Sequence, residues 1–221
     1  MALEVKHLQG IGMTSQRTRV RMVERLRDKG IRDERVLDAM AAVPRHLFVE
    51  EALASRAYED TALPIGYSQT ISQPFIVARM IEAVLPPRPE NVLEVGTGCG
   101  YQAAVLAQLF PLAYSVERIK ALLERARTNL LPLRLKNLRL AHGDGYAGLE
   151  PAAPFQAIVV AAATRQVPQA LLRQLRPDGK MILPLHEGAA QKLVLFQRNG
   201  PGFTESELDP VRFVPMKTGK T

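Results

Sequence analysis

Hydrophobic residues recur with a helical period in the first part of the chain. Val20, Val23 and Leu26 fall on one face of a helix that should end at residues 29–30. We interpret the arginines around this face as a solvated basic surface rather than a binding site: Arg17, Arg19, Arg21, Arg25 and Arg27. A second helix is expected after Asp33, whose short side chain suits a helix N-cap, and it should end before Pro44.

A stretch without a regular pattern follows, at residues 58–73, and we predict a long, ordered loop there. From Pro74 the helical period returns, and Ser72 is placed to cap this helix. Four residues rich in proline, 86–89, should end it. We therefore divide the chain into an N-terminal helical cap with a substrate loop, residues 1–89, and an α/β domain, residues 90–221, working as one catalytic unit.

Strand and helix patterns alternate through the second part. The predicted strands are residues 91–96, 112–117, 138–143, 155–162, 180–185 and 192–198, and the predicted helices are residues 101–110, 119–131 and 168–175. This alternation is typical of a doubly wound, mostly parallel Rossmann-like α/β sheet. The last strands would form a C-terminal β extension. Residues 155–162 are almost continuously apolar, as expected of a central strand covered on both faces.

A glycine-rich loop joins the first strand of this domain to its helix. Gly96, Gly98 and Gly100 would let the backbone approach a ligand that faces the helix N-terminus. The third glycine comes one residue too early for a dinucleotide fingerprint. Glu94, just before the loop, would repel a pyrophosphate and favour an ammonium or sulfonium group. The alternative is a glycine-rich turn that binds nothing.

Two further acids follow predicted strands. Glu117 lies about 20 residues after the glycine loop, where related folds place an acid on ribose hydroxyls. Alternatively it is a surface residue that pairs with Arg118 or Lys120. Asp144, between two glycines, could accept a proton from an adenine amino group, or it could simply form an Asx turn.

Composition narrows the class of protein. The 221 residues are 47% hydrophobic, enough for a substantial core, and contain no apolar run of the ~20 residues that a membrane span needs. Residues 1–7 lack the order of a secretion signal. A single cysteine, Cys99, excludes an internal disulfide and a cysteine-based zinc cluster, so we expect a cytoplasmic protein without a metal site. The net charge of +7 is spread along the chain, so a nucleic-acid partner is not expected.

Six segments together resemble the protein-L-isoaspartate(D-aspartate) O-methyltransferase family. They are residues 42–49, 63–74, 92–101, 115–118, 142–145 and 211–215, and the resemblance extends from about residue 18 to 216. The glycine loop alone indicates a class I S-adenosylmethionine-dependent methyltransferase fold. Residues 63–74 and 211–215 discriminate this family from other methyltransferases.

The resemblance implies an activity, a cofactor and a set of site residues. The expected reaction transfers a methyl group from S-adenosyl-L-methionine to the free carboxylate of L-isoaspartyl residues in damaged proteins and peptides, leaving S-adenosyl-L-homocysteine. D-Aspartyl residues are a second candidate acceptor. The cofactor contacts carried over are Glu94, Gly96, Thr97, Gly98, Glu117, Asp144 and Gly145. The substrate contacts are Thr70, Ile71, Ser72 and the Val214 backbone, with Ser72 as the catalytic residue. We also expect a monomer that does not bind membranes.

The chemistry agrees with this assignment. A carboxylate with a pKa near 4 is ionised at pH 7, so its attack on a methyl group needs no general base. Alignment of two bound reactants supplies up to roughly 7–11 kcal/mol. Ser72 would aim the carboxylate with one hydrogen bond, or it would cap the helix, or both.

Departures from the family pattern affect the peptide pocket. They are Gln156 and residues 161–165 and 177–179. A nucleic-acid methyltransferase would need a polar acceptor and a stacking aromatic at residues 161–164, where the chain has Ala-Ala-Ala-Thr. A nicotinamide dehydrogenase conflicts with the glycine spacing and with Glu94. A non-catalytic relative would need a broken cofactor site, and none is visible. Cys99 has no adjacent histidine and is interpreted as a packing residue.

Overall fold

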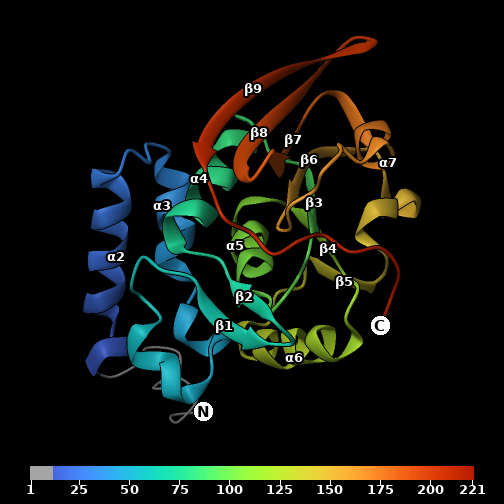
Figure 1. The fold of residues 1–221 in the computed structure, drawn as a ribbon. Coiled ribbons are helices and arrows are strands. Elements are labelled where there is room, and N and C mark those ends of the chain that lie inside the picture. Colours follow the sequence, from blue (N-terminus) through green and yellow to red (C-terminus); the bar gives the residue numbers. More distant parts are fainter. Residues whose placement is uncertain (1–11) are drawn as a thin grey trace.

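The computed structural model describes residues 12–221. Residues 1–7, from which we predicted that the chain has no secretion signal, lie outside the described residues. Its α-helices are α2 (Gln16–Asp28), α3 (Glu34–Ala42), α4 (Pro74–Val84), α5 (Tyr101–Leu109), α6 (Lys120–Leu130) and α7 (Gln169–Arg173) (Figure 1). Its strands are β1 (Leu63–Gly66), β2 (Gln69–Ile71), β3 (Asn91–Val95), β4 (Leu112–Glu117), β5 (Leu138–His142), β6 (Phe155–Val160), β7 (Leu175–Glu187), β8 (Ala190–Asn199) and β9 (Gly202–Pro210). Short 3-10 helices include η2 (Arg45–Phe48) and η5 (Gly145–Ala147).

The central sheet has the strand order β5-β4-β3-β6-β7-β8-β9. Neighbours from β5 to β7 run parallel, and β8 and β9 add antiparallel strands, which confirms the doubly wound Rossmann-like fold with a C-terminal β extension. Strand β9 was not predicted individually, and β7 is longer than the predicted residues 180–185. Within residues 12–221 no helix is long and apolar enough to cross a membrane.

Two apolar clusters lie on opposite faces of this sheet. Val92 and Val159 belong to the larger one, which continues through α4, α5 and α6 into the cap helices α2 and α3. Leu93 and Ile158 belong to the smaller one, which α7 covers. Adjacent strand residues thus enter different clusters, as a pleated strand buried on both faces requires. The cap shares one continuous core with the sheet.

The basic helix α2 differs from the prediction in its buried face. Val20 is 43% exposed, whereas Arg19 is 5% exposed beside Met22. The Arg19 guanidinium donates to the Ala41 carbonyl at 3.1 Å, so it ties α2 to the end of α3 instead of facing solvent. The interpretation of all five arginines as a solvated surface is therefore wrong for Arg19. The predicted cap of α3 is confirmed, since the Asp33 side chain accepts a hydrogen bond from the backbone N–H two residues later.

The predicted long loop contains a β-hairpin. Strands β1 and β2 pair antiparallel, with Leu63 opposite Ile71. Tyr67 and Ser68 form the turn at positive φ angles of 53° and 55°. The hairpin lies beside α6 (Figure 1), where Arg125 donates to the Ile65 carbonyl at 2.9 Å. A β-hairpin with a register shift between Pro64 and Gly66 thus replaces the predicted irregular loop over residues 63–71.

Helix α4 is capped by a distant residue. Gln73 occupies the N-cap position without a side-chain cap bond. Asp60 instead accepts a hydrogen bond from the Phe75 N–H at 2.9 Å and one from the Gln73 side chain at 3.2 Å. The predicted capping role of Ser72 is therefore wrong, because Asp60 reaches the helix terminus from outside the segment.

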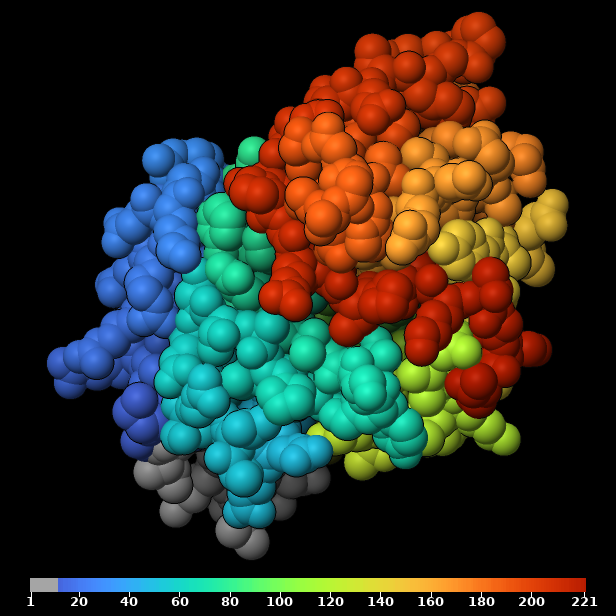
Figure 2. Space-filling model, viewed as in Figure 1, coloured from blue at the N-terminus to red at the C-terminus, as the bar shows by residue number. Residues whose placement is uncertain are grey.

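The chain end returns across the sheet. After β9, residues 211–221 run over the face that Figure 2 shows, between the hairpin region (teal) and residues 160–190 (orange). Ala163 donates to the Val214 carbonyl and accepts from the Met216 N–H, both at 2.8 Å. The Thr221 N–H then donates to the Arg118 carbonyl, also at 2.8 Å. The C-terminal segment is thus held at the carboxyl ends of the parallel strands.

Candidate active site

A cavity lies at the carboxyl ends of β3, β4 and β6, where ligands bind in open parallel sheets. It encloses about 890 Å³ of empty space, its open mouth included. Four stretches supply most of its wall: residues 69–72 of the hairpin, 94–99 of the glycine loop, 116–119 after β4, and 214–217 of the C-terminal segment. The cap, the sheet and the chain end therefore build one site together.

The glycine loop follows β3 as the spacing predicted. Gly96 and Gly98 have φ angles of 97° and 55°, in the left-handed region that favours glycine. A Cβ on Gly98 would stand 3.3 Å from the Ile65 side chain of the hairpin. The loop backbone therefore lies close to the cap and leaves its surface open to the cavity.

Glu94 is buried at the end of β3, with 1% of its surface exposed. Oε2 accepts a hydrogen bond from the Ser115 hydroxyl, whose oxygen lies 2.6 Å from that of Thr97. Burial raises the pKa of Glu94 to about 8, although the Ser115 hydrogen bond acts in the opposite direction. We expected an anion here, but with this pKa the carboxyl is protonated at pH 7 unless a positive charge lies beside it.

Two buried polar atoms of the site lack partners among the described residues. They are Oε1 of Glu94 and the side-chain nitrogen of Gln102, and both residues line the cavity. Unsatisfied buried polar groups are costly, so this pair fits a ligand that brings its own donors and acceptors. A cationic amino acid moiety has both, which is what S-adenosylmethionine would present. Sequence reasoning missed Gln102, although a polar residue at the second position of α5 was a usable signal.

Glu117 is also buried, at 5% exposure. Its two carboxylate oxygens accept hydrogen bonds from the backbone N–H groups of Gly98 and Ile119, each at 2.9 Å. The alternative of a surface ion pair with Arg118 or Lys120 is wrong, since the carboxylate points to the glycine loop. Glu117 lines the cavity and holds Gly98 in place.

Asp144 stands apart from the cavity lining, whereas Gly145 belongs to it. The Asp144 carboxylate accepts from the Tyr146 N–H at 2.9 Å, which is the Asx turn considered above, and from the Gly219 N–H at 2.7 Å. Its contact with adenine stays a prediction. Gly145 packs tightly, because an added Cβ would stand 2.5 Å from Val95 and 2.9 Å from Met216. Met216 is a lining residue that sequence reasoning missed.

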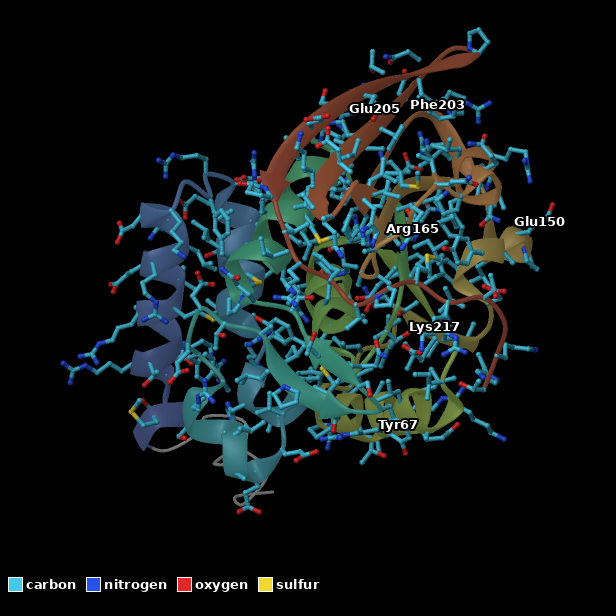
Figure 3. All side chains as sticks on the ribbon, in the orientation of Figure 1. Tyr67, Glu150, Arg165, Phe203, Glu205 and Lys217 are labelled. Atoms are coloured by element: carbon cyan, nitrogen blue, oxygen red, sulfur yellow. The ribbon has the colours of Figure 1, made fainter. Side chains whose placement is uncertain are left out.

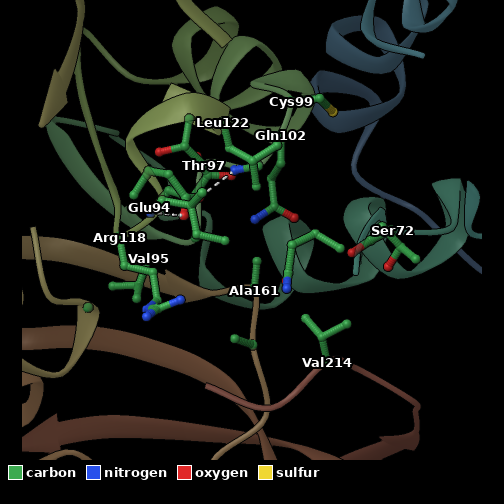
Figure 4. A pocket seen from close by; sticks show the side chains of 18 of the residues that line it. Ser72, Glu94, Val95, Thr97, Cys99, Gln102, Arg118, Leu122, Ala161 and Val214 are labelled. Carbon is green, nitrogen blue, oxygen red and sulfur yellow. Dashed lines mark hydrogen bonds between the residues drawn. The ribbon is translucent and has the colours of Figure 1, made fainter. Parts of the chain in front are cut away.

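The four predicted substrate residues, Thr70, Ile71, Ser72 and Val214, all line the cavity. Ser72 and Val214 lie on one side, opposite Glu94 and Thr97, with the Gln102 side chain between them (Figure 4). In the described part of the chain, no hydrogen bond involves the Ser72 hydroxyl or the Val214 N–H. Two donors at the cavity are thus free for a substrate.

Other side chains complete the surroundings. Cys99 is 3% exposed, and burial raises the pKa of its thiol to about 11, which suits a packing residue. Arg118 and Lys217 add positive charge to the cavity wall. Figure 3 shows Lys217, Arg165 and Tyr67 on the face where the C-terminal segment runs. No cluster of three or more histidine, cysteine or acidic residues suited to a metal ion occurs within residues 12–221.

Comparisons with known proteins agree on one family. The model of the protein-L-isoaspartate(D-aspartate) O-methyltransferase family matches residues 17–221. A protein-L-isoaspartate O-methyltransferase of Dechloromonas aromatica is 61% identical over 215 residues, covering 96% of this chain and 99% of the relative. One from Bordetella avium is 61% identical over 213 residues, covering 95% and 80%.

Solved structures give the same result. A protein-L-isoaspartate O-methyltransferase superposes with a TM-score of 0.82 at 28% identity, covering 91% of this chain and 67% of the other. A Plasmodium falciparum structure described as a protein of this kind, in complex with S-adenosyl-L-homocysteine, has a TM-score of 0.79 at 27% identity, covering 90% and 98%.

Proposed function

The chain belongs to the protein-L-isoaspartate(D-aspartate) O-methyltransferase family, and we propose that Ser72 and the Val214 N–H hold the substrate carboxylate in its cavity. The enzyme transfers a methyl group from S-adenosyl-L-methionine to the free carboxylate of L-isoaspartyl residues and thereby repairs damaged proteins. The observation that carries our proposal is that Ser72 and Val214 lie opposite Glu94 in the cavity, while the Ser72 hydroxyl and the Val214 N–H have no partner in the described part of the chain.

The cofactor would occupy the side of the cavity formed by the glycine loop. Glu94 and Gln102 would contact its charged amino acid moiety, and Glu117 and Gly98 would contact its ribose side. When bound, S-adenosylmethionine supplies a methyl group activated by a positive sulfonium. We propose further contacts by Gly96, Thr97 and Gly145, which line the same side, and by Asp144, which would have to engage adenine from just outside the lining.

The substrate carboxylate would enter from the hairpin side. Its negative charge is already present at pH 7, so no residue has to remove a proton. The Ser72 hydroxyl and the Val214 N–H each donate one hydrogen bond, which orients an oxygen lone pair without neutralising it. Thr70 and Ile71 line the cavity next to this position, and Ile71 is buried. Orientation and desolvation are therefore the catalytic contributions of the protein.

A Ser72→Ala variant tests this assignment, with Ser206→Ala on the exposed strand β9 as the matched control. We expect S72A to lower kcat for an isoaspartyl peptide by roughly 10- to 100-fold, as for loss of one hydrogen bond to a charged group. Its affinity for S-adenosylhomocysteine, measured by calorimetry, should match that of S206A. Loss of cofactor affinity in S72A, or an unchanged kcat, would contradict the proposal.

The acceptor is a protein rather than a nucleobase in this proposal. Ala161 and Ala162 line the cavity where a nucleic-acid methyltransferase would place a polar acceptor and a stacking ring. We also propose a cytoplasmic monomer, because the cavity is complete within one chain and the single cysteine is a buried free thiol. Light scattering after gel filtration tests the monomer, and a stable dimer would contradict it. The division at residues 89 and 90 and activity on D-aspartyl residues remain predictions.

A further inference from the structure

Arg45 is a fully buried arginine directly behind the substrate side of the cavity. It begins the short helix η2 and is 0% exposed. Its Nε donates to the Ala57 carbonyl and its Nη2 donates to the Ser72 carbonyl, both at 2.8 Å. The guanidinium therefore holds the backbone of the residue whose hydroxyl faces the cavity.

The same guanidinium also packs against the cofactor side. It stacks on the ring of Tyr101, 4.7 Å from the ring centroid. Tyr101 is the first residue of α5, immediately after the glycine loop, and it lines the cavity. The edge of Phe48, from the same short helix as Arg45, approaches this ring with centroids 5.6 Å apart. Tyr101 is thus fixed between two residues of the cap.

These contacts place one rigid planar group between the two halves of the site. Ser72 belongs to the segment that would hold the substrate, and Tyr101 belongs to the helix that follows the cofactor loop. A lysine could not replace the guanidinium, because an ammonium cannot stack on a ring and donate to two separated carbonyls in one plane. Methyl transfer depends on alignment of the two reactants, and a misplacement of about 1 Å can lower the rate roughly 100-fold.

We propose that Arg45 is a positioning residue for methyl transfer, which sets the distance between Ser72 and the cofactor loop. The inference rests on the proposed role of Ser72, through which Arg45 would act. It touches neither reactant, since Arg45 is absent from the cavity lining. Its contribution should therefore appear in kcat, with the affinity for the cofactor preserved.

The chain provides a matched control. Arg19 is a second buried arginine of the cap, at 5% exposure, and it also donates to backbone carbonyls, those of Ala41 and Ala42. It does not line the cavity. Arg19→Lys and Arg45→Lys thus make the same chemical change in similar surroundings, and a general loss of cap stability should appear in both.

The experiment compares wild type, R45K, R19K, S72A and the double variant R45K/S72A. For each we would measure kcat and KM with an isoaspartyl peptide, the affinity for S-adenosylhomocysteine and the thermal midpoint. We expect R45K to lower kcat and kcat/KM equally, at least ~10-fold, because Arg45 would act only in the transition state. The affinity of R45K for S-adenosylhomocysteine should stay within about 3-fold of wild type. R19K should keep kcat within about 2-fold of wild type when assayed well below its thermal midpoint. The kcat of R45K/S72A should lie within ~2-fold of that of S72A.

Several outcomes would overturn the inference. An R45K kcat within about 2-fold of wild type would remove the positioning role, as would an equal kcat loss in R19K or a parallel loss of cofactor affinity. A multiplicative effect in the double variant would show that Arg45 does not act through Ser72. The proposed role of Ser72 fails separately, if S72A alone keeps the wild-type kcat.

Discussion

Replacing Glu94 with glutamine should make the protein more stable and a weaker cofactor binder. The carboxyl is 1% exposed, accepts a hydrogen bond from Ser115, and has one oxygen without a partner in the described chain. Burial raises its pKa to about 8, from 4.5 for a free side chain. Glutamine keeps the shape and the hydrogen bond but cannot ionise.

The sign of the stability effect follows from proton binding. Between pH 4.5 and about 8 the folded protein holds a proton on Glu94 that the unfolded chain has lost, so the free energy of unfolding falls as the pH rises through this window. At pH 7, which lies above the unfolded-state pKa of 4.5, the buried Glu94 lowers the free energy of unfolding by on the order of 3 kcal/mol, at 1.36 kcal/mol per pH unit. E94Q has no such penalty, so its advantage should approach on the order of 3 kcal/mol at pH 7 and shrink toward zero near pH 4.5.

The assay has two parts. Urea unfolding of the cofactor-free protein at several pH values from 5.5 to 8 gives the difference in stability between wild type and E94Q. Calorimetry with S-adenosylmethionine in buffers of different ionisation enthalpy gives affinity and proton release. Because a bound cation should ionise Glu94, wild type should release a proton on binding at pH 7 and E94Q should not. E94Q should also bind S-adenosylmethionine roughly 10- to 100-fold more weakly, as for loss of a charged hydrogen bond. A pH-independent stability difference together with unchanged affinity would refute this reasoning.

Two further predictions concern the packing around the site. Asp60→Asn should destabilise the protein by about 1 kcal/mol at pH 7 through loss of the charged cap on α4. Burial alone would raise the pKa of Asp60, but hydrogen bonds from Lys29 and Phe75 outweigh burial and hold this pKa below its ordinary value. In urea unfolding, the stability difference between wild type and D60N should therefore vanish as the pH falls through the lowered pKa. A stability difference that stays constant with pH would contradict this prediction. Gly145→Ala should weaken S-adenosylhomocysteine binding at least ~10-fold, because the new Cβ would stand 2.5 Å from Val95 and push the loop into the cavity. Gly202→Ala is the control, because no atom lies within 4 Å of the Cβ that it would add. Equal affinities of the two variants in calorimetry would contradict the packing argument.

Local patterns were sufficient for the sheet and its strand ends. Strand β4 spans the residues predicted for it, and β6 begins at the predicted Phe155, because buried parallel strands are long apolar runs between helical periods. Glu94 and Glu117 were identified for the same reason, since an acid at a strand end interrupts a clear pattern. Gln102 comes from the next helix, α5, whose residues Tyr101–Ala107 are all buried, and its polar side chain there was a signal that sequence reasoning did not use.

Contacts between distant segments were not predictable. The hairpin strands are four and three residues long, and the turn has Tyr67 and Ser68 where sequence rules expect asparagine and glycine. Asp60 caps a helix that begins 14 residues later, so a local capping rule selected Ser72 instead. Arg19 and Arg45 are buried where backbone carbonyls of other segments accept their hydrogen bonds, whereas arginine is usually a surface residue.

The central claim is that this cavity selects the carboxylate of an isoaspartyl residue. The most direct measurement is the transfer of labelled methyl groups from S-adenosylmethionine to two peptides that differ at one position, isoaspartyl or aspartyl, with RNA as a third acceptor. The account predicts base-labile labelling of the isoaspartyl peptide, with neither the aspartyl peptide nor the RNA labelled above background. Equal labelling of both peptides, or labelling of RNA alone, would contradict it.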